Sequence, residues 1–308
     1  MKVLLLVNSS ASSVTGRAKV LIRRALSERH EVTLAETSRR GHATRLARGA
    51  AADGMDLVVV LGGDGTLNEA ANGLVRTDCA MAALPGGSTN VFARTLGIPD
   101  DPVEATTVVL DAVDAGRIRR VGLGRVNGRY FLFHCGLGFD AAVVEQVEKR
   151  SGLKRYAGHP LFIWAGLTTW LRHYDRRRPH MRVLRPDGSD TGDLYLAIVQ
   201  NTDPYTYLGS RPLSLAPEAT FDRGLTCVGL RSMSLRPMLS VVWSLIRGDT
   251  GIRDHPMVSY DTDLSCLDVV GLGPFPYQVD GDLVGDTEKL AFNWDPECLD
   301  LVVPGPGI

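Results

Sequence analysis

The sequence predicts a two-domain chain in which an α/β domain is followed by a mainly antiparallel β domain. Three observations support this fold class. Short apolar strands alternate with helical segments as far as about residue 115, and glycine-rich turns follow the strands Leu57–Leu61 and Ala80–Leu84. From about residue 120 onward, short strands are separated by turns such as Asn127-Gly128. A length of 308 residues with 44% hydrophobic content suits two domains with sizeable cores.

The elements of the first domain are predicted from the spacing of their apolar residues. Continuous apolar runs such as Leu57–Leu61 are typical of strands buried on both faces of a parallel sheet, and apolar residues three or four apart indicate helices. The alternation predicts a parallel sheet with helices on both faces. The predicted strands are Lys2–Val7, Glu31–Leu34, Leu57–Leu61 and Ala80–Leu84, and the helices are Arg17–Ser27, His42–Ala52, Asn68–Leu74, Val91–Arg94 and Val103–Ala115.

A candidate phosphate site lies at the turn Gly62-Gly63-Asp64-Gly65 and the Thr66 that follows it. A strand, a glycine turn and a helix expose backbone amides to phosphate oxygens. The turn matches neither a Walker loop nor a dinucleotide fingerprint, and a tight turn without a ligand is the alternative. A second loop of the same construction, Pro85–Asn90, favours a ligand crevice at the carboxyl ends of adjacent strands.

Polar residues also follow the first two strands. Asn8–Ser13 is a run of small polar residues that either hydrogen-bonds a phosphate or forms a turn, and Thr37 follows the second strand. In a parallel sheet both segments are expected beside the glycine turns.

The second domain contains a segment that departs from the antiparallel pattern. Its predicted strands are Arg117–Val126, Arg129–His134, Met181–Leu184, Leu194–Gln200 and Leu225–Leu230. Lys149–Arg178 is apolar, contains tryptophan and is flanked by basic clusters, which suits either an interfacial helix on an anionic membrane or a core helix with solvated charges. A second apolar helix is predicted at Met238–Ile246. The strand Cys298–Pro304 could return to either domain.

Composition excludes several classes of protein. A net charge of -1 argues against a general nucleic-acid binder, and five widely spaced cysteines suggest neither a zinc site nor a disulfide framework. No apolar stretch approaches the roughly 20 residues of a spanning helix. We therefore expect a cytoplasmic protein.

Late in the chain, Val279-Asp280-Gly281-Asp282 places two carboxylates across one glycine. This pattern is a turn in most contexts. If the two domains close on a cleft, Asp280 could act as the general base on an acceptor hydroxyl in phosphoryl transfer.

An ordered set of motifs, spread over nearly the whole chain, resembles the diacylglycerol kinase catalytic family, which includes bacterial lipid kinases and sphingosine and ceramide kinases. The set is Gly62–Glu69, Pro85–Arg94, Asn127–Phe131, Gly136–Asp140, Pro217–Ala219 and Val279–Asp282. The resemblance implies an NAD-kinase-like three-layer nucleotide domain over residues 1–122, to which a strand at about 296–308 could return. An antiparallel β-sandwich lipid-substrate domain with helical insertions is implied over 123–295.

The resemblance also implies site residues, with ATP and Mg²⁺ as cofactors. Asp280 would accept the proton with Asp282 beside it, and Asp64 would help to hold nucleotide-bound Mg²⁺. The implied ATP site comprises Asn8, Ser9, Ser10, Ala11, Ser12, Thr37, Gly62, Gly63, Asp64, Gly65, Thr66, Leu67, Asn68, Glu69, Gly86, Gly87, Ser88 and Asn90.

Four positions depart from the family pattern, one of them Asp282, which is one methylene shorter than the usual glutamate and keeps the charge. Val91 and Gly122 stand where acidic residues are common, and Arg223 stands where the family's structural-metal aspartate is expected. A cation cannot ligate Mg²⁺, which argues against that structural metal site.

The function predicted from these observations is ATP-dependent phosphorylation of the hydroxyl of diacylglycerol or a similar membrane lipid. The expected partners are the lipid substrate and an anionic membrane surface, to which the protein binds peripherally, without nucleic acid; a homodimer through exposed sheet edges is compatible with the fold. The alternatives are a soluble small-molecule kinase of the NAD-kinase-like fold and a non-catalytic nucleotide- or lipid-binding protein.

Overall fold

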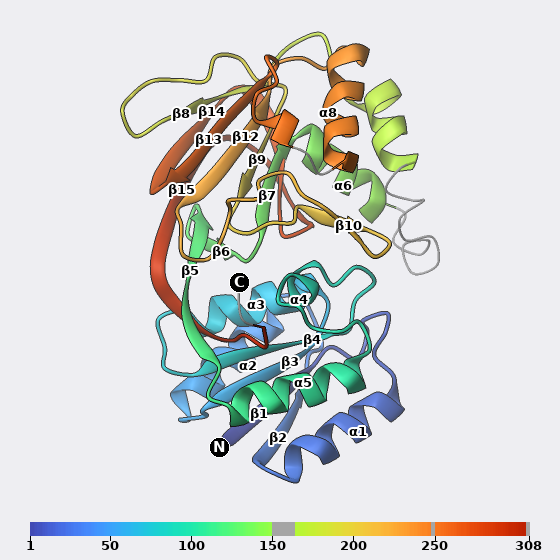
Figure 1. Cartoon of the computed structure of the whole chain (residues 1–308), viewed down its shortest axis with the longest axis vertical. Helices are drawn as coiled ribbons and strands as arrows, with labels where there is room; N and C mark the ends of the chain where they lie inside the picture. Colours follow the sequence, from blue (N-terminus) through green and yellow to red (C-terminus); the bar gives the residue numbers. More distant parts are fainter. Residues whose placement is uncertain (150–163, 248–249, 306–308) are drawn as a thin grey trace. The chain divides into compact units, whose positions relative to one another are not determined.

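The computed structural model describes residues 1–149, 164–247 and 250–305. The chain divides into two compact units (Figure 1). Unit 1 consists of Met1–Leu123 together with Pro296–Ile308, and unit 2 consists of Gly124–Asp295.

Unit 1 is built on a parallel sheet of four strands in the order β4-β3-β1-β2, and a fifth strand, β15 (Asp282–Val302), joins it at β4. The four are β1 (Lys2–Val7), β2 (Glu31–Glu36), β3 (Leu57–Gly62) and β4 (Ala80–Pro85). Every residue of β3 and β4 is buried, as their unbroken apolar sequences predict. The parallel pairing brings Leu301 of β15 opposite Met81.

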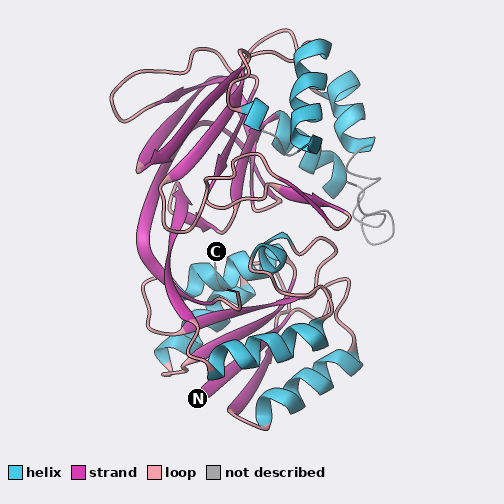
Figure 2. Cartoon of the chain, in the orientation of Figure 1, coloured by secondary structure: helices cyan, strands magenta, loops and turns pink. Residues whose placement is uncertain are grey.

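Helices cover both faces of this sheet, with α1 and α5 on one face and α2 and α3 on the other (Figures 1 and 2). Thr15 caps α1 through its hydroxyl, and Asp101 caps α5 through two backbone amides. The helices of unit 1 are α1 (Gly16–Ser27), α2 (His42–Ala52), α3 (Asp64–Leu74), α4 (Val91–Thr95) and α5 (Pro102–Asp114).

The helix after the first glycine turn begins earlier than the sequence predicts. We expected it at Asn68, but α3 begins at Asp64 because the carbonyl of Gly63 already accepts the amides of Thr66 and Leu67, at 2.9 and 3.1 Å. Asp64, Gly65 and Thr66 therefore belong to the first turn of the helix.

Unit 2 is mainly antiparallel, with β13-β12-β9-β7-β14-β15 as its central strand order. Besides β15, the strands of unit 2 are β5 (Ile118–Val126), which enters it from unit 1, β6 (Arg129–Phe131), β7 (His134–Gly138), β8 (Met181–Leu184), β9 (Leu196–Gln200), β10 (Thr206–Leu208), β11 (Arg211–Leu213), β12 (Leu225–Leu230), β13 (Val258–Leu264) and β14 (Cys266–Val279). The helical elements are α6 (Phe139–Glu148), the π-helix η1 (Thr169–His173), α8 (Leu235–Arg247) and the 3₁₀ turn η2 (Thr250–Ile252).

The sheet of unit 2 is covered on both faces, as the alternation of its side chains shows. On β9, Ala197 and Val199 enter one buried cluster, while Ile198 enters a second cluster on which α8 and η1 pack. Successive residues of a strand point to opposite faces, so each face of this strand has its own core.

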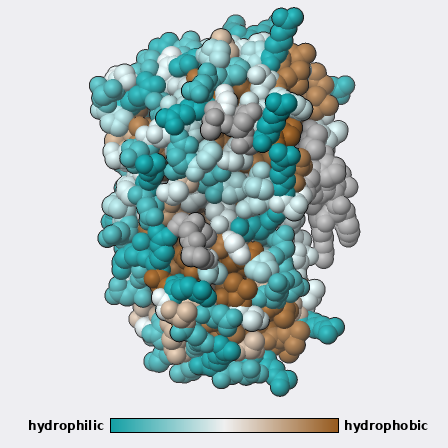
Figure 3. Space-filling view, in the orientation of Figure 1, coloured by the Kyte–Doolittle hydropathy of each residue, from teal (hydrophilic) through white to brown (hydrophobic). Residues whose placement is uncertain are grey.

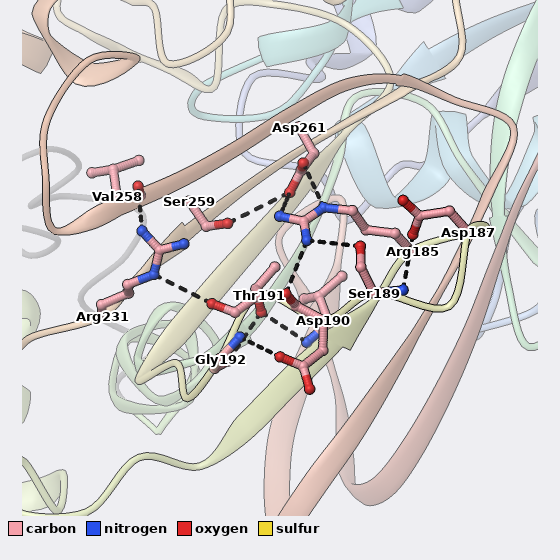
Figure 4. A network of polar contacts seen from close by, with 11 residues as sticks. Arg185, Asp187, Ser189, Asp190, Thr191, Gly192, Arg231, Val258, Ser259 and Asp261 are labelled. Atoms are coloured by element: carbon pink, nitrogen blue, oxygen red, sulfur yellow. Dashed lines mark hydrogen bonds and ion pairs between the residues drawn. The ribbon is translucent and has the colours of Figure 1, made fainter.

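At the edge of unit 2, Arg185, the residue directly after β8 (Met181–Leu184), joins a polar network (Figure 4). Its guanidinium binds the Asp261 carboxylate of β13 with two hydrogen bonds of 2.7 and 3.1 Å. A second arginine, Arg231, donates to the carbonyl oxygens of Thr191 and Val258. These contacts tie the loop after β8 to the strand β13.

The predicted helix over Lys149–Arg178 lies partly outside the described residues, which resume at 164. Residues 164–168 are helical and continue into η1. Trp170 donates from its indole nitrogen to the carbonyl of Met233, at 3.2 Å, which ties η1 to the segment before α8. Among the described helices, none combines the length and the apolar composition needed to cross a membrane.

Candidate active site

The polar loops that the sequence singled out in unit 1 follow the carboxyl ends of its parallel strands. The chain order of the strands reverses between β1 and β3, which is where open α/β sheets form ligand crevices. The loops after β1, β3 and β4 are joined directly by hydrogen bonds, and Thr37 follows β2, its amide donating to the carbonyl of Val7 at 2.9 Å.

The two glycine loops touch backbone to backbone. A Cβ atom on Gly86 would lie 2.8 Å from the Cα of Gly62, and one on Gly87 would lie 2.9 Å from the Cα of Gly63. Real Cβ atoms do not approach other atoms that closely, so glycine is required at both positions. The amide of Gly86 also donates to the carbonyl of Gly62, at 2.9 Å.

The carboxylate of Asp64 connects the two glycine loops. Its oxygens accept the amides of Val91 and Phe92, at 3.1 and 2.9 Å. These are the first two residues of α4, whose own N-cap residue, Asn90, makes no side-chain cap bond. Asp64 therefore places the start of α4, a role that the sequence did not reveal because donor and acceptor are 27 and 28 positions apart.

The loop after β1 is fixed to both glycine loops. Asn8 donates from Nδ2 to the hydroxyl of Thr66, at 2.9 Å, and its Oδ1 accepts from the amide and hydroxyl of Ser10. Ser13 donates from its amide to Gly86 and from its hydroxyl to Gly87. Sequence reasoning placed Ser13 in the polar run but not among the site residues.

Two predicted ATP-site residues have partners that organise the edge of the site. The Ser9 hydroxyl donates to Glu36, at 2.7 Å, and hydrogen bonds from Lys19 and Ser9 lower the pKa of Glu36. The Glu69 carboxylate accepts hydrogen bonds from the amides of Gly41 and Ala43 and so caps the start of α2. Glu69 thus supports the helix that follows Thr37.

The remaining predicted ATP-site residues lie in the same three loops or in α3. Asn90 is buried, accepts the amide of Gly87 at 2.7 Å and donates to its carbonyl, which closes the second glycine loop. Asn68 is buried in α3 and accepts from Asn72. Ala11 and Ser12 are half-buried in the loop after β1, Leu67 is buried and Ser88 is exposed.

In unit 2, Asp280 occupies the turn that joins β14 to β15 and is only 3% exposed. Its carboxylate accepts three backbone amides, from Leu132 at 2.7 Å, Phe133 at 3.0 Å and His134 at 3.1 Å. Asp280 and Gly281 both have positive φ, 48° and 81°, so the turn is in the left-handed region. The predicted strand Arg129–His134 is in fact divided into β6 and β7, because the amides between them face this carboxylate.

A series of hydrogen bonds among buried side chains supports the Asp280 turn. Gln278 is fully buried; it donates from Nε2 to Asp140, at 2.8 Å, and accepts the amide of Gly281, at 2.7 Å. Asp140, in the first turn of α6, also accepts the hydroxyl of Tyr205. Burial and the neighbouring Asp140 carboxylate raise the pKa of Tyr205 well above its ordinary value, so the hydroxyl keeps its proton and remains a donor.

Asp282, the second predicted catalytic carboxylate, lies two residues after Asp280 and faces a cation. Its Oδ2 lies 3.7 Å from Nη2 of Arg129, and its side chain is 28% exposed. The carboxylates of Asp280 and Asp282 therefore have different environments, one among buried amides and one in a partly solvated ion pair.

The loop at Arg223 does not present the ligands that a structural cation site would require. Asp222 and Arg223 are both exposed, and the amide of Gly224 donates to the Asp263 carboxylate, at 2.9 Å. Within the described ranges no three His, Cys, Asp or Glu side chains gather where they could hold a metal ion. A guanidinium at Arg223, where the family's site needs a carboxylate, does not fit a structural cation.

Comparison with known proteins gives concordant matches. The family model for the diacylglycerol kinase catalytic domain matches residues 2–126. A diacylglycerol kinase of Bacillus subtilis is 30% identical over 225 residues, which are 71% of this chain and 70% of that protein.

Solved structures show the same fold. A diacylglycerol kinase structure from Bacillus anthracis aligns over 98% of this chain and 96% of its own, with a TM-score of 0.77 and 23% identity. An NAD kinase from Archaeoglobus fulgidus, solved in complex with ATP, aligns over 98% of this chain and 93% of its own, with a TM-score of 0.53 and 11% identity. The fold class predicted from the sequence is therefore confirmed.

Proposed function

Because the chain belongs to the diacylglycerol kinase catalytic domain family, we propose that it transfers the γ-phosphoryl group of ATP to the hydroxyl of diacylglycerol or a similar membrane lipid. Asp280 is the proposed general base. The observation that carries this role is its carboxylate, which is buried, sits in a left-handed turn and is oriented by three backbone amides. A base in phosphoryl transfer has to be held in position relative to the acceptor hydroxyl.

The proposed nucleotide site is the group of polar loops in unit 1. Gly62, Gly63, Gly86 and Gly87 keep side chains away from two adjoining stretches of backbone, whose amides suit phosphate oxygens. ATP, when bound, supplies the phosphoryl group and its leaving group. We assign Asp64 two roles, one in holding α4 against the first glycine loop and one beside nucleotide-bound Mg²⁺.

Membrane association is proposed through the exposed apolar side chains of unit 2. Trp164, Leu167 and Trp243 are 41%, 57% and 56% exposed, on helical segments that carry arginine nearby. Side chains of this kind enter the interfacial layer of a bilayer, where basic residues meet anionic lipid. A kinase whose acceptor is a membrane lipid has to reach it at that layer.

The test is the variant Asp280→Asn, assayed for transfer of labelled phosphate from ATP to dispersed diacylglycerol. Loss of a general base is expected to lower kcat by about 10²- to 10⁴-fold. ATP binding, measured separately, is expected to stay within about twofold, because the nucleotide loops lie in unit 1.

Asp286→Asn is the matched control, since Asp286 is an exposed carboxylate on the same hairpin. A melting temperature close to that of the unmodified protein excludes loss through misfolding. Normal transfer by Asp280→Asn would contradict the assignment of the base. Absence of transfer by the unmodified protein to any lipid of a whole-membrane extract would contradict the proposed function itself.

A further inference from the structure

A pocket of about 410 Å³ in unit 2 is lined by η1, the residues that follow it and the segment leading into α8. It is distinct from the Asp280 turn, which contributes none of its lining. Its charged lining side chains are Arg172, Arg176, Arg177 and Asp175, and two serines, Ser232 and Ser234, also line it.

The charges in this pocket favour an anion. One oxygen of the single carboxylate, Asp175, accepts the backbone amide of Arg177 at 2.9 Å, so it is engaged by its own loop. Arg176 stacks on Trp170, with its guanidinium carbon 3.9 Å from the ring centroid, which fixes that cation beside the pocket. Arg172 and Arg177 are exposed. Guanidinium groups bind phosphate with paired hydrogen bonds, a geometry that ammonium groups lack.

An apolar rim adjoins the cationic pocket. Leu171, which lines the pocket itself, is 53% exposed, and Leu235, Leu239 and Trp243 of α8 are 54%, 58% and 56% exposed. The last three are spaced four residues apart and share one helical face, and α8 begins directly after the pocket residue Ser234. Figure 3 shows hydrophobic side chains gathered at the upper right, where Figure 1 places α8.

The opposite face of α8 is already occupied. Met238, Val241 and Leu245 pack against the buried cluster on the helix-covered face of the sheet. The exposed apolar face is therefore in excess of what the fold of unit 2 needs, and contiguous exposed apolar residues mark an interaction surface.

We propose that this pocket binds the phosphate of an anionic phospholipid headgroup in a bilayer while Leu235, Leu239 and Trp243 enter the interfacial layer. Charge and apolar surface together select this occupant. A free phosphate ion would use only the arginines, and a nucleic acid would leave the apolar rim in water, whereas a phospholipid satisfies both. This headgroup site deepens the proposed membrane association and does not depend on the phosphoryl-transfer step.

The test is co-sedimentation of the full chain with vesicles of phosphatidylcholine, prepared with and without phosphatidylglycerol and without ATP. The double variant R172Q/R177Q is expected to lose at least about tenfold in partitioning onto the anionic vesicles, since one basic side chain near such a surface contributes about fivefold. The control R23Q/R48Q removes two exposed arginines of unit 1 and is expected to change partitioning by less than about twofold.

Two further variants separate a phosphate pocket from diffuse attraction. R172K/R177K keeps the charge and loses the paired geometry, so it is expected to bind more weakly than the unmodified protein. W243S keeps the pocket and loses part of the rim, and it too is expected to bind more weakly. Equal loss in R172Q/R177Q and R23Q/R48Q would overturn the proposal, as would full binding by R172K/R177K or failure of the unmodified protein to sediment with anionic vesicles.

The outcome is distinguishable from that of the kinase assay. Transfer to diacylglycerol dispersed in detergent does not require the headgroup pocket, so R172Q/R177Q is expected to keep that activity. If the protein bound anionic vesicles but transferred no phosphate, only the proposed function would be contradicted. If it transferred phosphate but its vesicle binding did not depend on the pocket arginines, only this inference would be contradicted.

Discussion

At the scale of single residues, the position of Asp280 depends on groups far away in the sequence. Its three amide donors belong to Leu132, Phe133 and His134, and its turn is supported by Gln278 and Asp140. The Asp-Gly-Asp pattern could be recognised in the sequence as a turn carrying carboxylates. The three backbone amides that bind its carboxylate could not be recognised there, because the donors are 146 to 148 positions away and only the fold brings them together.

Replacing Gln278 with Met is expected to disturb the Asp280 turn while preserving side-chain volume. The change leaves Asp140 and the amide of Gly281 without this partner, which costs about 1–3 kcal/mol of stability for buried polar groups. We expect kcat to fall at least tenfold, on the order of 1.4 kcal/mol. The KM for ATP should remain unchanged, because the nucleotide loops belong to unit 1.

Gln200→Met is the matched control, since Gln200 is also fully buried and donates to the carbonyl of Thr202 instead. Urea unfolding of both variants gives their losses of stability, and steady-state kinetics gives kcat and KM. If both variants lost kcat equally at equal stability, Gln278 would have no positioning role beyond its contribution to the core.

At the scale of elements, the strands and helices of unit 1 follow from the sequence almost residue by residue, because each buries an apolar face of regular period. β1 matches its predicted range, and β3 and β4 differ from theirs by one residue at the end. Elements whose limits are set by distant partners were not predictable. The break between β6 and β7 is set by Asp280, 146 to 148 positions away, whereas the early start of α3 is set locally by the carbonyl of the adjacent Gly63.

The short helix α4 shows the same dependence on a distant partner and allows a sharp test of Asp64. Asp64→Asn replaces an oxygen acceptor with an amide donor that faces the start of α4, so ATP affinity is expected to fall about tenfold. If Asp64 acts by placing α4, the loss occurs with Mg²⁺ and also in the presence of a chelator. Calorimetric titration under both conditions measures it.

Asp101→Asn provides the control, because Asp101 likewise accepts two backbone amides at a helix start, those of Val103 and Glu104 on α5. Both variants are expected to lose on the order of 1 kcal/mol of stability, but only Asp64→Asn should weaken nucleotide binding. A loss confined to the Mg²⁺ condition would show that Asp64 acts through the metal alone.

At the scale of the whole molecule, the two units share one long strand. β15 pairs with β14 in unit 2, and its last residues pair with β4 in unit 1. The sequence predicted a strand near its end but left open which domain it joins, since a short apolar run carries no information about its partner. Leu299, Leu301 and Val302 are fully buried there.

Leu301→Ala is expected to destabilise unit 1 by about 2–5 kcal/mol, the range for removing a buried leucine side chain. Val284→Ala on the same strand is the control; its side chain is 42% exposed, and the change should cost less than about 1 kcal/mol. Hydrogen exchange followed by mass spectrometry should show faster exchange in β4 for Leu301→Ala. Exchange that changes only within β15 would show that this strand is peripheral to unit 1.

The late return of β15 has a consequence for biosynthesis. Residues 296–302 leave the ribosome only after the whole of Gly124–Asp295 has been translated. At about 5–20 residues per second that interval lasts roughly ten to thirty seconds. Throughout it the nascent first unit has an open edge at β4, available to chaperones or to other chains, and it acquires its fifth strand only when residues 296–302 emerge from the exit tunnel.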